Sequence, residues 1–179
     1  MKRTDAFRKV RTICQRLDEV DLETFPVQPL KLYLYGSLLT DKPDPHDVDL
    51  ILVFDQGRNI DIDRDILMAL SYGRPLPFQR ARTQLRRGMK MVNMGDAEGG
   101  LQNWMQLNLL LAGVRPRLIW KPGFNWAAVL ERIEQSPDVW AGPRPPDAKE
   151  QLEARIKALP KAEKVAKLAQ AMAEVEAQG

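Results

Sequence analysis

The spacing of apolar and polar residues along the chain predicts alternating helices and strands. Between residues 4 and 20, apolar side chains recur at three- and four-residue steps, which is typical of an amphipathic helix. Runs rich in β-branched and aromatic residues follow at 31–35 and 48–54, bounded by proline, glycine and aspartate, and they predict two strands. A third strand is expected at 89–94.

The other periodic segments predict helices and one more strand. Helices are expected at residues 61–71, 78–87, 97–112 and 124–135. The first of these should turn four apolar side chains inward, namely Ile62, Ile66, Leu67 and Leu70. A fourth strand is expected at 114–120, where Pro116 favours an edge position. This order predicts an α/β or α+β fold, in which helices pack on one side of a small mixed sheet.

The C-terminal part of the chain differs in composition from the rest. We expect a domain over residues 1–140, a proline-rich hinge at 141–147 and a helical tail at 148–179. Two amphipathic helices, separated at Pro160, should form the tail, and their apolar stripes must be covered. Packing against the domain, a helical hairpin, a homodimer contact and another protein partner all stay open.

Charge, cysteine content and apolar runs give limited information about the class of protein and its location. The 179 residues carry a net charge of +3 with a pI of about 9.1, which suits an anionic substrate without requiring one. The single cysteine, Cys14, cannot form an internal disulfide, which favours a reducing compartment. The first residues lack the apolar core of a signal peptide, and no apolar run is long enough to span a bilayer. We therefore expect a cytoplasmic protein.

Two aspartates on the second predicted strand are the strongest sign of chemistry. Side chains at positions i and i+2 of a strand point to the same face, so Asp47 and Asp49 should converge. Two carboxylates this close favour a bound cation, and their hard oxygen atoms suit Mg²⁺, which often also binds substrate phosphates. The first strand ends in Gly36 and Ser37, where a glycine would let phosphates approach the backbone closely.

These residues together resemble the nucleotidyltransferase superfamily related to DNA polymerase beta. The shared pattern is Tyr35-Gly36-Ser37, a gap of nine residues, and Asp47-Val48-Asp49-Leu50. The resemblance covers about residues 4–95. It implies that Asp47 and Asp49 bind Mg²⁺ and act in catalysis, and that Gly36 and Ser37 hold the triphosphate of an NTP.

The sequence departs from that family at its third carboxylate. The resemblance places this acid on a later strand between two apolar residues, and Asn93 stands there instead. Asparagine offers an oxygen atom to a metal but brings no charge. Asp96 lies just beyond and is a possible substitute.

The resemblance implies transfer of a nucleoside monophosphate from an NTP to a hydroxyl group of an RNA, a protein or a small molecule. Because Asn93 replaces an acid, a catalytically impaired binding module with the same fold is the alternative. Such a module would act on a protein partner or a nucleic acid. A structural protein in which both motifs are coincidental is a third interpretation.

A run of thirty residues without acidic side chains gives a separate indication. Residues 66–95 contain no Asp or Glu but several cations. We expect Arg82, Arg86 and Lys90 to be exposed on the Asp47 side of the domain and to bind the triphosphate or a nucleic acid. A solvated basic face is the alternative interpretation.

The lone histidine and the tryptophans carry weaker signals. His46, directly before Asp47, would contact a phosphate or remain an ordinary loop residue. The four tryptophans are expected mainly in the core, although Trp120 and Trp126 flank a turn and would be able to line a base pocket.

Overall fold

The computed structural model describes residues 1–56, 61–139 and 148–178. The helices are α1 (Arg3–Asp18), α2 (Ile62–Tyr72), α3 (Pro77–Leu85), α4 (Leu107–Leu111), α5 (Trp126–Gln135), α6 (Ala148–Ala158) and α7 (Lys161–Glu176). The strands are β1 (Val27–Tyr35), β2 (Val48–Gln56), β3 (Val92–Glu98) and β4 (Arg117–Trp120). Two 3₁₀ turns accompany them, η1 (Gly36–Leu39) and η2 (Leu101–Asn103).

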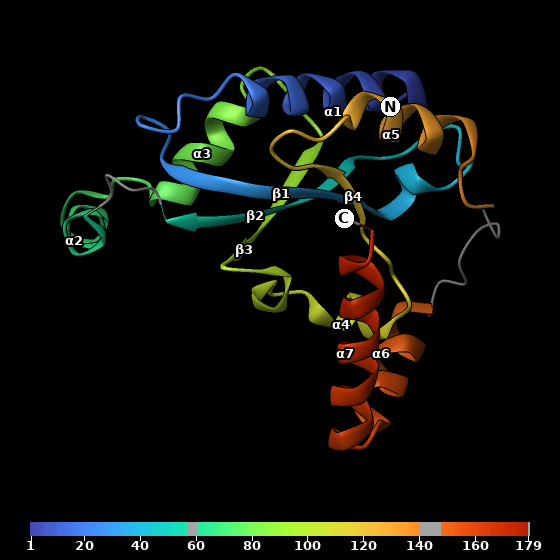
Figure 1. Ribbon diagram of the computed structural model, residues 1–179. Coiled ribbons are helices and arrows are strands. Elements are labelled where there is room, and N and C mark those ends of the chain that lie inside the picture. Colours follow the sequence, from blue (N-terminus) through green and yellow to red (C-terminus); the bar gives the residue numbers. More distant parts are fainter. Residues whose placement is uncertain (57–60, 140–147, 179) are drawn as a thin grey trace.

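The strands form one mixed sheet in the order β3-β2-β1-β4 (Figure 1). β1 pairs antiparallel with both β2 and β4, whereas β2 pairs parallel with β3. The register places Tyr35 opposite Asp49, and Asp49 opposite Asn93. β4 follows Pro116 and lies at an edge, as the sequence predicts.

Alternate side chains of β2 enter two separate cores. Leu50 and Leu52 belong to a core on the face covered by α1, α3 and α5, which we call the first face. Ile51 and Val53 belong to a core on the opposite, second face, which α4, α7 and η2 cover. The predicted mixed sheet is confirmed, but the expectation of helices on one side is wrong. The sequence pattern of β2 already explains this, because an almost continuous apolar strand is buried on both faces.

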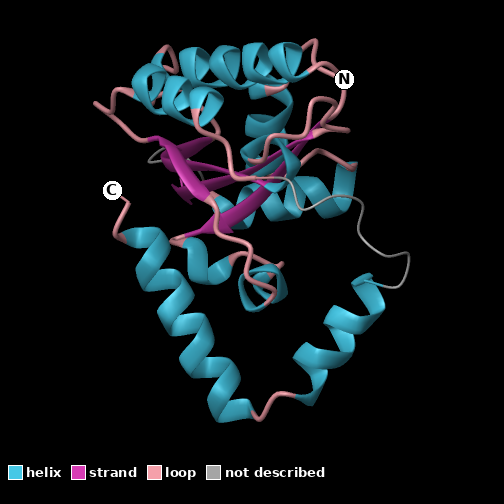
Figure 2. Ribbon diagram, turned by 90° about the vertical axis from the view of Figure 1, so that its right-hand side faces the viewer, coloured by secondary structure: helices cyan, strands magenta, loops and turns pink. Residues whose placement is uncertain are grey.

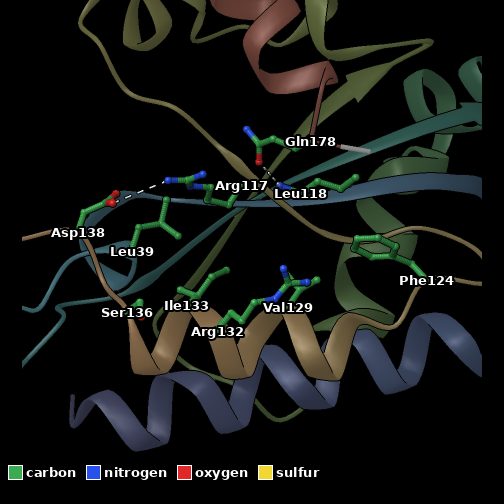
Figure 3. Close-up of a pocket in the computed structure, with 10 residues that line it drawn as sticks. All are labelled: Leu39, Arg117, Leu118, Phe124, Val129, Arg132, Ile133, Ser136, Asp138 and Gln178. Atoms are coloured by element: carbon green, nitrogen blue, oxygen red, sulfur yellow. Dashed lines mark hydrogen bonds and ion pairs between the residues drawn. The ribbon is translucent and has the colours of Figure 1, made fainter.

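The C-terminal helix packs against the domain. Val175 is buried in the core of the second face, and Glu174 forms an ion pair with Arg115 at 2.6 Å. The Gln178 side chain accepts a hydrogen bond from Leu118 N at 3.2 Å, at the outer side of β4 (Figure 3). The C-terminal end of α7 therefore packs against the sheet, whereas the rest of α7 projects away from it and α6 diverges from α7 (Figure 2). The expected hinge at 141–147 lies outside the described residues.

Two helical predictions need correction. The expected helix over 97–112 is correct only for α4, at Leu107–Leu111. Its first part is wrong, because β3 continues to Glu98 and the chain then turns through Gly99 and Gly100, both at positive φ. In α2, Leu67 and Leu70 do not face inward, and their exposed fractions are 61% and 82%. The helix stands to one side of the sheet, so these two leucines do not reach a core (Figure 1). The side chains of Ile62 and Ile66 lie outside the description.

Among the described residues, no helix is both long enough and apolar enough to cross a membrane.

Candidate functional site

The two motif aspartates converge on a single amide group. Asp47 lies directly before β2 and Asp49 lies within it. The Asn93 side chain donates from Nδ2 to Asp47 Oδ2 at 2.7 Å and to Asp49 Oδ1 at 3.1 Å. One nitrogen atom thus reaches both carboxylates, which confirms that they lie close enough together to share a cation. The cation itself stays a prediction.

Asn93 occupies the place where a third carboxylate is expected. It is the direct neighbour of Asp49 across the parallel β2–β3 pair, so both side chains point to the second face. Asp96 pairs instead with Leu52, whose side chain lies in the core of the first face. Because side chains alternate along a strand, Asp96 points away from the aspartate pair. It does not substitute for the missing acid.

Gly36 leaves space for the carboxylate of Asp49. A Cβ atom placed on Gly36 would lie 2.6 Å from Asp49 Oδ2, closer than any ordinary contact. The residue also has a φ of +81°, in the region that favours glycine. Ser37, next in the chain, is half-buried in the 3₁₀ turn η1. The motif glycine is therefore required by the position of the aspartate as well as by its own backbone.

Tyr35 lies beside the carboxylates, opposite Asp49 in the β1–β2 pair, and Trp104 packs against it. Their rings meet edge to face with centroids 5.2 Å apart. Burial raises the pKa of Tyr35 to about 12, and the nearby carboxylates of Asp49 and Asp47 add to that effect. Sequence reasoning did not place Trp104 at this site. Its periodic apolar neighbours predicted a helix, and no local pattern indicates a contact with Tyr35, about seventy residues earlier.

The charge of Asp49 is only partly compensated. Burial raises the pKa of this carboxyl group above its usual range, the hydrogen bond from Asn93 lowers it, and the charge of Asp47 raises it again. A carboxylate in this position favours an additional positive charge. The donor set, two aspartate oxygens and an amide that would present Oδ1 after a half-turn, fits one Mg²⁺. The described residues contain no group of three or more acidic, His or Cys side chains suited to a metal.

The predicted basic residues do not all join this site. α3 carries Arg82 and its C-cap Arg86, and its buried residues Ala81 and Leu85 belong to the core of the first face. The helix thus covers the face opposite to Asp49, so the expected placement of both arginines beside the aspartates is wrong. They are also half-buried rather than exposed. Only Lys90 is exposed, two residues before the start of β3.

Of the remaining candidate residues, two tryptophans have a structural role, and His46 lies exposed at the surface. Both Trp120 and Trp126 donate their indole N–H groups to the carboxylate of Asp18, each at 2.7 Å. This shared bond ties α1 to β4 and α5, and it does not form a base pocket. His46 is exposed. Trp140 lies outside the described residues.

A separate hollow of about 420 Å³ lies between α5 and the β4 edge. Figure 3 shows Ile133 on α5 facing Leu39, and Arg117 directed toward Asp138. Neither the aspartate pair nor Asn93 lines it. The hollow is therefore not part of the candidate site.

Comparison with known proteins adds little to this geometry. No protein-family model matches the chain, and no curated protein matches it. A solved structure with a related arrangement is that of a "putative nucleotidyltransferase" from Sulfolobus solfataricus, with a TM-score of 0.36 and 17% identity. The alignment covers 67% of this chain and 84% of that one. A likeness of this size does not establish an activity.

Proposed function

We propose that the chain binds an NTP together with Mg²⁺ and transfers its nucleoside monophosphate to a hydroxyl group. The observation that carries this proposal is the convergence of Asp47 and Asp49 on one point beside Gly36. Two carboxylates lie within reach of one atom, next to a glycine whose missing side chain leaves space. This arrangement suits a metal-bound triphosphate.

Each residue has a distinct role in this proposal. Asp47 and Asp49 would hold the cation, which when bound neutralises charge on the phosphates and on the attacking oxygen. Gly36 keeps the space next to Asp49 open, and the Ser37 hydroxyl would bind a phosphate oxygen. Tyr35, held by its contact with Trp104, would exclude water from one side of the carboxylates. The acceptor, an RNA, a protein or a small molecule, is not defined by these residues.

A second candidate is nucleotide binding without transfer. Asn93 favours it, because its amide supplies no negative charge where a third acid would help to activate the attacking hydroxyl. In this case the chain would be a binding module that uses the nucleotide as a ligand for a protein partner or a nucleic acid.

The double substitution Asp47→Asn and Asp49→Asn tests both candidates. In the wild-type protein, Mg²⁺ with ATP or GTP should raise the melting temperature, and this rise should disappear in the variant. The metal-free variant should be at least as stable as the wild type, because the substitutions remove two neighbouring negative charges. A variant with Asp44→Asn and Asp55→Asn, two exposed aspartates outside the site, is the matched control.

Transfer is measured separately, with α-³²P-labelled NTPs and a cell extract as the source of acceptors. Label that becomes covalently attached with wild-type protein, but not with the aspartate variant, supports transfer. Binding without any attached label supports the second candidate. A wild-type response in the aspartate variant would place nucleotide binding elsewhere and overturn both.

A further inference from the structure

Three arginines gather at the C-terminal end of α3, and we call Arg82, Arg86 and Arg87 the arginine cluster. They line a surface hollow of about 420 Å³. Thr83, Gly88 and Met89 complete its wall. No residue of the aspartate pair contributes to it.

The positive charge of this cluster is not neutralised. None of its members forms an ion pair within the described part of the chain, whereas the neighbouring Arg80 is paired with Asp65 at 2.7 Å. Burial lowers the pKa of Arg86, and the like charge of Arg82 lowers it further. The Nε atom of Arg86 is buried and has no hydrogen-bond partner in the described structure. An anion in the hollow would relieve the repulsion between the guanidinium groups.

The arginine cluster is not needed to compensate the carbonyl groups at the C-terminal end of α3. Its terminal carbonyl groups accept hydrogen bonds from Arg16, at 2.6 Å to Leu85 O and 3.0 Å to Arg87 O. Lys9 likewise donates to Lys90 O. Cations from α1 therefore already compensate the negative end of the helix and the loop after it. The cluster remains available for a ligand.

Nearby acids limit the direction from which an anion arrives. Glu19 and Asp21 line a neighbouring hollow together with Arg87. Within the described part of the chain, no acid lines the hollow of the cluster itself. An anion would therefore approach Arg82 and Arg86 first, with Arg87 at the border.

The chemistry of the hollow favours phosphate groups over bases. Guanidinium groups bind phosphate oxygens in pairs. Phe78, the ring under Arg82 at 5.8 Å, is already stacked on Phe54 at 5.1 Å. No free aromatic face in the hollow is therefore left for a base. A ligand held by phosphates alone, without base contacts, fits the backbone of a nucleic acid better than a single nucleotide.

We propose that the arginine cluster binds the phosphate backbone of a nucleic acid strand. The site is separate from the aspartate pair, because α3 covers the opposite face of the sheet. This inference does not depend on nucleotide transfer.

Fluorescence anisotropy with a labelled single-stranded oligouridine RNA tests the proposal at several salt concentrations. The triple variant Arg82→Gln, Arg86→Gln and Arg87→Gln should bind at least about tenfold more weakly at low salt. Its plot of log affinity against log salt should be less steep by about 0.7 for each phosphate group that the variant no longer binds. The matched control, Arg155→Gln, Lys157→Gln and Lys161→Gln, removes the same charge from α6 and α7 and should bind as the wild type does.

Further variants and a competition experiment test the proposal if the triple variant does not fold. If the triple variant unfolds, Arg87→Glu alone, at an exposed position, should still weaken binding about threefold or more. The variant Asp47→Asn with Asp49→Asn should retain RNA binding even if it loses nucleotide binding. Unchanged affinity and salt dependence in the cluster variants would overturn the proposal. So would complete displacement of the RNA by an equimolar amount of inorganic triphosphate, which would identify a site for free polyphosphate.

Discussion

Asn93 lies directly across the parallel β2–β3 pair from Asp49 and donates a hydrogen bond to its carboxylate at 3.1 Å. The amide thus stands at the position where a further acid would complete a three-carboxylate site. It holds the two aspartates together without adding charge. The charge at position 93 would therefore decide how strongly the proposed site attracts a cation.

Replacing the amide by an acid should make the site depend on metal. Asn93→Asp removes the donor and adds a third negative charge, so the metal-free protein should lose about 1–3 kcal/mol of stability. Mn²⁺ or Mg²⁺ should restore the melting temperature and bind more tightly than to the wild type, as measured by calorimetric titration. Asn108→Asp, on α4, adds the same charge away from the site. Equal metal affinity in Asn93→Asp and the wild type would show that residue 93 does not face the cation.

The close approach of Gly36 to Asp49 predicts a specific defect. Gly36→Ala places a Cβ atom 2.6 Å from Asp49 Oδ2 at a φ of +81°, so the carboxylate must move. Gly113→Ala is the matched control, since Gly113 has a φ of +88° but open space around it. Both variants should lose about 1 kcal/mol or more from backbone strain. Only Gly36→Ala should also lose Mg²⁺-dependent nucleotide binding, and equal binding in the two variants would contradict this.

The bond between Asp18 and two tryptophans predicts a measurable contribution to stability. Asp18→Asn leaves one oxygen atom to accept from the indole groups of Trp120 and Trp126, and it removes the negative charge. We expect a loss of about 1–2 kcal/mol in the free energy of unfolding by urea, with a change in tryptophan fluorescence of the folded protein. Asp5→Asn, on the same helix and paired only with Arg8 at the surface, should change neither. The idea fails if the two variants behave alike.

The ion pair that attaches α7 predicts a dependence on pH. The hydrogen bonds from Arg115 and Gln170 lower the pKa of Glu174 below its usual 4.5. A carboxyl group with a lowered pKa in the folded state stabilises the protein above its unfolded pKa, and this contribution disappears as the pH falls through the folded pKa. Glu174→Gln should therefore lower the melting temperature at pH 7 by no more than about 3 °C, and the difference should vanish in acid.

Glu163→Gln removes a charge from the same helix, where Glu163 pairs with Lys167 one turn away. This control should not change hydrogen-exchange protection at the junction of α7 with the sheet, whereas Glu174→Gln should reduce it. A difference between Glu174→Gln and the wild type that persists unchanged at acidic pH would contradict the assignment.

Local patterns were sufficient wherever a residue's partners are near in sequence. The helix over residues 4–20 and the two tail helices were predicted to within a few residues, because apolar spacing and proline positions act locally. The convergence of Asp47 and Asp49 also followed from the alternation of side chains along one strand. Patterns failed after β3, where pairing with β2 extends the strand and overrides the helical spacing that follows.

By itself, the sequence determined where the described strands follow one another along the chain, the paired aspartates and the glycine that precedes them, since each is a property of a short segment. Only the tertiary structure decided which face of the sheet each helix covers. An amphipathic helix needs an apolar surface, and both faces of this sheet provide one. That choice placed α3, with Arg82 and Arg86, on the face opposite to Asp49. The chain after β3 packs on the other face, where Trp104 contacts Tyr35. The chemistry of the two faces was therefore separated by packing, which no local pattern in the chain encodes.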